Sequence, residues 1–247
     1  MDTETADRLV ALNYRFYQSF AAPFSETRLR LQPGVTRLLE EIPLDARILD
    51  LGCGGGALAG VLAQRGQTGP YLGLDFSEEL LEAAQISVEL LEASKSLAGE
   101  YAFKQVDLTD PTWAETLRPE PFDCILAFAI LHHIPGTELR ARLLTQIHKY
   151  LAPNGNLLLS NWQFLNSERL RDRIQPWERA GISADNVDAG DALLDWRRGG
   201  EGLRYAHQFT EAELAALAKE TDFSIHDTFY ADGEGGNLGL YQVWGPR

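Results

Sequence analysis

The 247-residue sequence contains only two cysteines, Cys53 and Cys124. Cys53 lies in a glycine-rich stretch and Cys124 in an apolar run, so neither is placed to form a structural disulfide. Disulfides belong to oxidising compartments and are rare in the cytosol. We therefore expect two reduced thiols and a cytoplasmic protein.

Long apolar runs and positive charge are also scarce. No apolar run approaches the ~20 residues of a membrane span, and the first eight residues, MDTETADR, lack the basic and apolar parts of a signal peptide. Lys and Arg together number 22, of which only four are Lys, against 36 Asp and Glu, which gives a net charge of −14. This balance disfavours contact with membranes and nonspecific contact with nucleic acid.

Apolar runs alternate with amphipathic helical patterns along most of the chain, which is typical of an α/β fold with a parallel sheet between two layers of helices. Strands are expected over 47–51, 71–74, 102–106, 124–129, 156–161, 224–230 and 238–244. Helices are expected over 5–20, 33–41, 57–64, 78–97, 112–117, 137–150 and 210–219. The last two strands flank the turn sequence DGEGG, so they should pair antiparallel. The pattern predicts a seven-stranded, doubly wound, Rossmann-like sheet, mostly parallel with an antiparallel C-terminal hairpin.

We expect one domain over 1–247, with an N-terminal helical cap over 1–45 and an insertion over 162–209. The stretch 161–210 interrupts the alternation of strands and helices and holds seven arginines and three tryptophans. An insertion of this composition before the last helix predicts either a substrate lid or a packing subdomain that covers the end of the sheet.

The stretch ILDLGCGGGALAG, residues 48–60, predicts a tight turn that approaches a ligand closely. Gly52 and Gly54 fit the G-x-G-x-x-G/A spacing, which dinucleotide sites share. Asp50, two residues earlier, would repel a pyrophosphate and attract the ammonium and sulfonium groups of S-adenosylmethionine (SAM). An alternative role for Asp50 is to accept hydrogen bonds from the turn's own amides. The stretch therefore favours SAM over a nicotinamide or flavin.

The sequence LHHIP places His132 beside His133. Adjacent side chains of an extended segment point to opposite faces, so we do not expect the pair to share a metal, and no metal site is predicted. One imidazole beside the methyl donor would act as a base or orient the substrate. We choose His132 for that role.

Four stretches, ILDLGCGGG, YLGLDFS, KQVDL and FDCILAFAILHHIP, together resemble class I SAM-dependent methyltransferases over residues 47–161. The resemblance implies SAM as the cofactor, with Gly52 and Gly54 under its methionine moiety and Asp50 near its amino group. Further cofactor contacts are implied for Asp75 at the ribose, for Phe76, Asp107 and Leu108 at the adenine, and for the Ala127 carbonyl at the methionine. Carboxylates only accept hydrogen bonds, so they suit a diol and an exocyclic amine. The alternative for Asp75 and Asp107 is an exposed loop carboxylate.

Four other stretches, YRFYQSFAAPFSETR, SNWQF, GDALLDW and LRYAHQFTEAEL, resemble the family that methyl-esterifies 5-carboxymethyluridine at the tRNA wobble position. This resemblance implies that Arg28 and His132 are catalytic. It implies substrate contacts for Tyr17, Trp162, Trp196, Arg204, Tyr205 and His207. Some tRNA enzymes of this family gain affinity from a small activating partner subunit, which would supply positive charge here.

A carboxylate acceptor is already ionised at neutral pH, so it needs a cation and a dry site rather than a strong base. Arg28 or Arg204 would grip it bidentately; the alternatives are a surface charge for Arg28 and a salt-bridged lid for Arg204 and His207. The sequence thus predicts SAM-dependent O-methylation of a carboxylate, with tRNA wobble uridine as the acceptor. The acidic charge keeps a small-molecule acceptor open, and a noncatalytic SAM-fold partner or regulatory subunit is the non-enzyme alternative.

Overall fold

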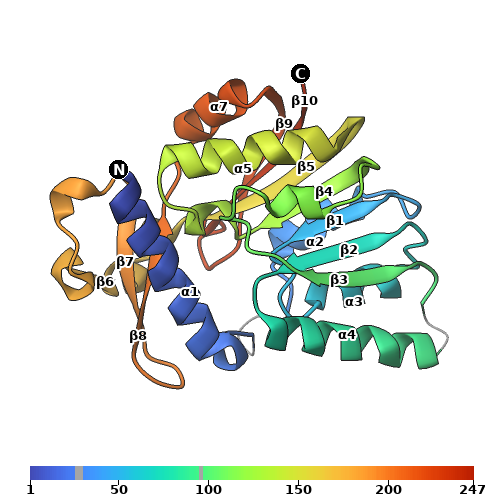
Figure 1. The fold of residues 1–247 in the computed structure, drawn as a ribbon, viewed down its shortest axis with the longest axis horizontal. Coiled ribbons are helices and arrows are strands. Elements are labelled where there is room, and N and C mark those ends of the chain that lie inside the picture. Colours follow the sequence, from blue (N-terminus) through green and yellow to red (C-terminus); the bar gives the residue numbers. More distant parts are fainter. Residues whose placement is uncertain (26–29, 95–96) are drawn as a thin grey trace.

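The computed structural model describes residues 1–25, 30–94 and 97–247, of which 21–25 are described as backbone only. Arg28, which the sequence predicts to be catalytic, lies outside the described residues. A large sheet with helices on both faces forms most of the molecule (Figure 1). A smaller sheet lies beside it, covered by helix α1 (Thr3–Ser25).

The large sheet has the seven strands that the sequence predicts, in the order β3-β2-β1-β4-β5-β10-β9. Their bounds are β1 Ile48–Leu51, β2 Tyr71–Asp75, β3 Tyr101–Gln105, β4 Phe122–Phe128, β5 Leu151–Trp162, β9 Phe223–Ala231 and β10 Gly239–Pro246. Strands β1 to β5 pair in parallel, whereas β10 is antiparallel to both of its neighbours. The mostly parallel sheet and the C-terminal hairpin are confirmed. The sequence alone did not show that β10 inserts between β5 and β9.

Helices cover both faces of this sheet (Figure 1). One layer consists of α2 (Pro33–Glu40), α3 (Ala57–Gln64) and α4 (Glu78–Ala93), and the other of α5 (Thr137–Tyr150) and α7 (Glu211–Glu220). Alternate residues of β1 pack into the two layers, Leu49 toward α5 and α7 and Ile48 toward α2 and α3. All four residues of β1 are buried for this reason, which explains its nearly continuous apolar sequence.

Local signals at the helix starts are confirmed. The Ser77 hydroxyl caps α4 by accepting the Leu80 amide at 3.4 Å, and the Thr210 hydroxyl caps α7 by accepting the Glu213 amide at 3.2 Å. The helix expected at 112–117 is a single 3₁₀ turn. Among the helices that the structure describes, none combines the length and the apolar character needed to cross a membrane.

Residues 162–209 contain a second sheet, which the sequence did not predict. Its antiparallel strands are β6 Ile174–Gln175, β7 Asp191–Trp196 and β8 Gly202–His207, and the short helix α6 (Glu168–Arg171) precedes them. Leu194 and Ala206 pack on Phe164 on one face, while Tyr205 packs on Leu9 of α1 on the other. Because other residues cover both faces of the small sheet, β7 is buried along nearly its whole length. Its sequence therefore lacks the alternation of apolar and polar residues that marks a half-exposed strand.

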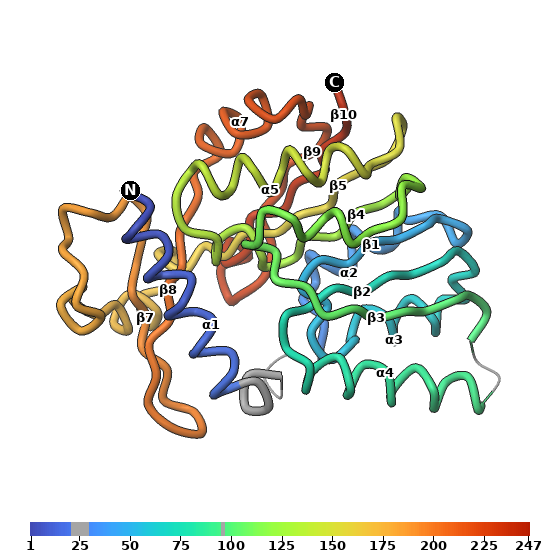
Figure 2. Tube along the Cα trace, viewed as in Figure 1, coloured from blue at the N-terminus to red at the C-terminus, as the bar shows by residue number. Residues whose placement is uncertain are grey.

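The 1–45 segment divides between the two sheets. Helix α2 packs on the large sheet, whereas α1 lies along β7 and β8, as the trace in Figure 2 shows. Asn13 fixes α1 there: its side-chain oxygen accepts the Tyr205 amide at 2.8 Å, and its nitrogen donates to the carbonyls of Tyr205 and His133 at 3.2 Å. The assignment of a cap over 1–45 and a substrate lid over 162–209 stays a prediction. In the structure, α1 and the insertion form one layer.

Candidate active site

The predicted cofactor residues gather at the carboxyl ends of β1, β2, β3 and β4, where open α/β sheets bind ligands. The turn after β1 depends on glycine, since Gly52 and Gly54 have φ angles of 71° and 54°. A side chain at Gly52 would also collide with Ile130. At Gly54, by contrast, no atom of the described residues beyond its chain neighbours lies within 4 Å of the position a Cβ would take. The turn is therefore tight on one side and open on the other.

Strand β2 holds this turn in place. The amides of Gly52 and Cys53 donate to the Leu74 carbonyl at 2.7 and 2.9 Å, and the Gly54 amide donates to the Asp75 carboxylate at 2.9 Å. Burial raises the pKa of Asp75, while hydrogen bonds from backbone amides oppose that effect. The carboxylate predicted to bind the ribose is thus fixed to the turn predicted to lie under the methionine.

Asp50 is 1% exposed and accepts a hydrogen bond from the Tyr71 hydroxyl at 2.6 Å. Burial raises the pKa of Asp50 to about 7; the bond from Tyr71 opposes this rise, and the charge of Asp75 adds to it. A buried carboxylate is costly to ionise unless a cation approaches it. Because β2 binds the amides of the turn, the structure does not support the alternative role of Asp50 as their acceptor.

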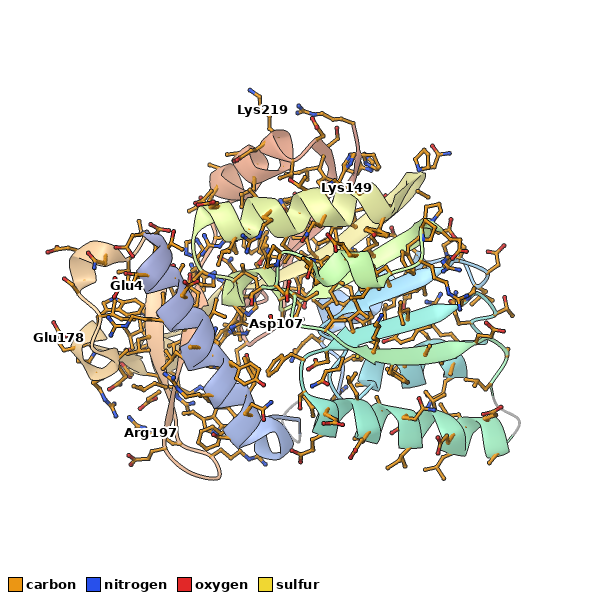
Figure 3. The ribbon with its side chains drawn as sticks, viewed as in Figure 1. Glu4, Asp107, Lys149, Glu178, Arg197 and Lys219 are labelled. Carbon is orange, nitrogen blue, oxygen red and sulfur yellow. The ribbon has the colours of Figure 1, made fainter. Side chains whose placement is uncertain are left out.

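Asp107 follows β3 and is exposed at the sheet edge (Figure 3). Its carboxylate accepts hydrogen bonds from the Thr109 amide and hydroxyl at 2.8 and 2.6 Å. These bonds leave a second carboxylate oxygen to accept from a ligand. The carboxylates of Asp50, Asp75 and Asp107 thus lie at the carboxyl ends of β1, β2 and β3, and this set of acceptors fits a cationic ligand that bears a diol and an amine.

The remaining predicted cofactor residues contribute apolar surface. Phe76 is half-buried, and its ring centroid lies 5.2 Å from that of Tyr14 and 6.1 Å from that of Tyr17, both on α1. Leu108 is half-buried against the main core, and Ala127 is buried on β4. Helix α1 therefore lies over the part of the site predicted to hold the adenine.

His132 and His133 do not point in opposite directions, and that expectation was wrong. Residues 131–133 form a 3₁₀ turn rather than an extended segment, so the two ring centroids lie 4.2 Å apart. His132 is 2% exposed and accepts the Trp162 amide at 3.2 Å. His133 is half-buried; its Nδ1 donates to the Tyr205 carbonyl at 3.2 Å, which leaves Nε2 to accept the Tyr17 hydroxyl at 2.8 Å. The choice of His132 stays a prediction, and His133 makes the contact with α1.

Arg204 on β8 of the insertion is surrounded by aromatic rings and faces α1. The Arg204 guanidinium carbon is 4.7 Å from the ring centroid of Trp162, 5.6 Å from that of Phe16 and 5.7 Å from that of Trp196. The side chain of Trp162 also lies 6.3 Å from the His132 ring. The structure therefore brings three of the predicted substrate residues together next to the histidine pair. Phe16 was not predicted, because its spacing on α1 is that of an ordinary core residue.

His207 does not join this cluster. It is fully buried, and its two ring nitrogens lie 2.7 Å from Asp191 and 2.8 Å from Glu213. Burial works against the charged imidazole, but the two carboxylate hydrogen bonds outweigh it and raise the pKa of His207. The Arg140 guanidinium lies 3.7 Å from Asp191 and 3.5 Å from Glu213, and it donates to the Tyr205 hydroxyl at 2.8 Å. This buried network ties β7 and β8 to α5 and α7, as the salt-bridged alternative for His207 implies.

Sequence reasoning also missed a strained residue beside the histidines. Ala129 directly follows β4 and has a φ angle of 58°, which L-residues other than Asn and Asp rarely adopt. Its amide donates to the hydroxyl of Ser160 at 3.0 Å and to the carbonyl of Ser160 at 3.1 Å. Strained backbone of this kind is common where a fold must aim a functional segment. Here the turn aims residues 131–133 across the end of β5.

A sequence profile of the methyltransferase domain family matches residues 24–228, which is most of the chain. The chain belongs to the methyltransferase domain family. The open glycine turn and the carboxylates of Asp50 and Asp75 fit SAM as the methyl donor.

Several curated relatives of this methyltransferase carry tRNA in their names. The human probable tRNA methyltransferase 9B is 27% identical over 183 residues, which cover 73% of this chain and 36% of the relative. The tRNA (carboxymethyluridine(34)-5-O)-methyltransferase of Arabidopsis thaliana is 25% identical over 149 residues, or 60% of this chain and 32% of the relative. The trans-aconitate 2-methyltransferase of Azoarcus is 30% identical over 145 residues, or 57% of this chain and 50% of the relative. This chain therefore spans only a third to a half of the length of these relatives.

Solved structures share the fold. A SAM-dependent methyltransferase from Methanosarcina mazei superposes with a TM-score of 0.67 at 24% identity, covering 87% of this chain and 97% of that one. The magnesium protoporphyrin IX methyltransferase of Synechocystis, crystallised with SAM, has a TM-score of 0.54 at 20% identity, covering 86% and 76%. These structures support the Rossmann-like sheet that the sequence predicts.

Proposed function

We propose that this methyltransferase esterifies the carboxylate of 5-carboxymethyluridine at the tRNA wobble position. The observation that carries the proposal is the position of Arg204, whose guanidinium lies between aromatic rings from α1, β5 and β7, next to the histidine pair. The printed names of the curated relatives support a tRNA acceptor.

Bound SAM supplies an electrophilic methyl group on a sulfonium. In the proposed reaction, Arg204 binds the acceptor carboxylate through its planar fork of N–H donors. Trp162 and Trp196 pack on the guanidinium, so its orientation is limited and water is kept from the carboxylate. The acceptor is ionised at neutral pH, so no side chain has to remove a proton.

The histidine pair would position the acceptor rather than act as a base. The bond between the Tyr17 hydroxyl and His133 joins α1 to the end of β4, directly beside Phe76. His132 is held in place by the Trp162 amide, which donates to its Nδ1. Arg28, outside the described residues, is proposed as a second cation for the carboxylate.

A small carboxylic acid is the second candidate acceptor. The chain has a net charge of −14, which opposes long-range attraction of tRNA, and one relative is named for trans-aconitate. A tRNA acceptor therefore implies an added source of positive charge, and we propose a small activating subunit in the cytoplasm, where Cys53 and Cys124 remain reduced thiols.

The test is transfer of a labelled methyl group from SAM to two separate pools, with and without a cell extract as a source of the partner. One pool is tRNA bearing carboxymethylated wobble uridine, and the other is a mixture of small carboxylic acids. The Asp75→Ala variant, expected to lose the cofactor, gives the background. We expect label in tRNA that mild base releases, as an ester requires. Label confined to the small acids would overturn the tRNA acceptor, and base-stable label would overturn the ester.

A further inference from the structure

A groove runs along the outer side of α1, where this helix meets the insertion. It consists of two adjoining hollows of about 210 and 380 Å³ that share Leu12 and Arg15. The first hollow reaches Ala180 and Ile182, and the second reaches the loop between β7 and β8 at Glu201. We call these residues, with Arg8, Phe16, Phe20 and Arg179, the α1 groove.

The α1 groove is lined by three arginines and one acid. Arg8 donates to the carbonyls of Ala180 and Gly181 at 3.2 and 2.6 Å, and Arg179 donates to the side-chain oxygen of Gln175 at 2.6 Å. These acceptors are neutral, so they orient the guanidinium groups without cancelling their charge. Within the described parts of the chain, neither these two arginines nor Arg15 forms an ion pair with a carboxylate.

This arrangement is unusual for a chain with a net charge of −14. Acids outnumber basic residues overall, so unpaired arginines in one groove are not explained by the general composition. Like charges held close together repel, and an anion in the groove would relieve that repulsion. Guanidinium groups bind phosphate oxygens bidentately, which makes phosphate the best-matched anion.

Two aromatic residues, Phe16 and Phe20, line the second hollow, and Phe16 also contacts the proposed acceptor site. The Phe16 ring lies 5.3 Å from that of Phe20 and 5.7 Å from that of Trp196, and Arg204 lies over both Phe16 and Trp196. The neighbouring residue Tyr17 contacts Phe76 and His133. A chain lying in the groove would therefore lie next to the acceptor site, because Phe16 contacts both.

We infer that the α1 groove binds the sugar–phosphate backbone of an RNA strand that flanks the methylated base. Proteins that bind single-stranded nucleic acid without reading its sequence combine a positively charged groove with aromatic side chains. The inference rests on the proposed function, because it names the surface by which the acceptor strand reaches the same site.

The test compares two double variants of equal charge in the full chain. Arg15→Glu/Arg179→Glu reverses two arginines of the groove, and Arg118→Glu/Lys219→Glu reverses two exposed charges elsewhere; Figure 3 shows Lys219 on α7, away from α1. Binding of tRNA is measured at several salt concentrations. We expect the groove variant to bind about tenfold or more weakly, with the slope of log affinity against log salt reduced by roughly 1.5, while the control matches the wild type. Equal weakening in both variants would overturn the groove.

A second readout separates the groove from the proposed function. Methyl transfer to the free nucleoside 5-carboxymethyluridine uses the acceptor site but not the groove, so the groove variant should keep this rate while losing transfer to tRNA. If the wild type methylates tRNA and the two variants do so at the same rate as the wild type, the proposed function stands and the groove is overturned. Arginine-dependent tRNA binding without any ester would leave the groove and overturn the function. If the groove variant also loses its thermal transition, it is replaced by Arg15→Gln, because the Arg15 side chain makes no hydrogen bond to any residue that the structure describes.

Discussion

The two halves of the active site are built in different ways. The cofactor half consists of contiguous stretches, in which β1, the glycine turn and the end of β2 exchange hydrogen bonds within 25 residues of sequence. The acceptor half joins segments far apart in the chain: Asn13 bonds to Tyr205, Tyr17 to His133, and Arg140 to Tyr205. Short-range motifs therefore indicate how the first half is assembled, whereas only the fold shows how the distant segments of the second half come together.

This difference predicts that the halves respond separately to substitution. The buried network of Arg140, Asp191, His207 and Glu213 holds the insertion on the large sheet, and none of its members lies in the glycine turn or beside Asp75. A substitution in this network should therefore destabilise the acceptor half and leave SAM binding by the cofactor half unchanged.

The largest effect is expected from Arg140→Met. Arg140 is fully buried, and its removal takes away the guanidinium that the carboxylates of Asp191 and Glu213 share, which leaves His207 as the partner that they still share. Breaking a buried ion pair from one side costs about 3–5 kcal/mol. Denaturant unfolding measures the loss of stability, and hydrogen exchange should place that loss in α1, β7 and β8.

The matched control Arg37→Met breaks the exposed pair with Asp227 and should cost at most about 1 kcal/mol. Equal costs for the two variants would show that the network does not hold the insertion.

The sequence predicted the large sheet well because both its strands and its helix caps leave local signals. Asp50, Gly52, Gly54, Asp75 and Asp107 lie at the predicted sheet edge for the same reason. The second sheet was missed because β7 and β8 are covered on both faces and their partners lie in α1 and after β5. The resemblance to the wobble-uridine family predicted His207 near the substrate, and a single sequence does not show its buried contacts with Asp191 and Glu213.

The second-largest effect is expected from Asp75→Ala, which changes the cofactor half alone. Asp75→Ala removes the predicted ribose acceptor and the carboxylate that binds the Gly54 amide. Loss of charge-assisted hydrogen bonds of about 2–3 kcal/mol corresponds to roughly 30- to 150-fold weaker SAM binding. Calorimetric titration measures this affinity. Hydrogen exchange in β7 and β8 should stay as in the wild type, and unchanged SAM affinity would mean that the cofactor lies elsewhere.

A smaller effect should appear as a pH dependence. Asp50 has a pKa raised to about 7, so its carboxylate is mostly neutral at pH 6 and mostly ionised at pH 8. A cationic cofactor prefers the ionised form, so SAM affinity should rise with pH, by up to about tenfold between these values. The Asp50→Asn variant keeps an acceptor for Tyr71 and should give a flat profile. The same rise in both proteins would assign the pH dependence to another group.

The most direct measurement of the separation between the halves uses Arg204→Lys, with SAM affinity and methyl transfer to carboxymethyluridine tRNA determined on the same preparation. Lysine keeps the charge but lacks the planar fork, so it loses the bidentate grip on a carboxylate. We predict unchanged SAM affinity and a rate of transfer lower by about 100-fold, a magnitude that misplacement of a reacting group commonly produces. Transfer at the wild-type rate would contradict the role of Arg204, and a parallel loss of SAM affinity would contradict the separation of the two halves.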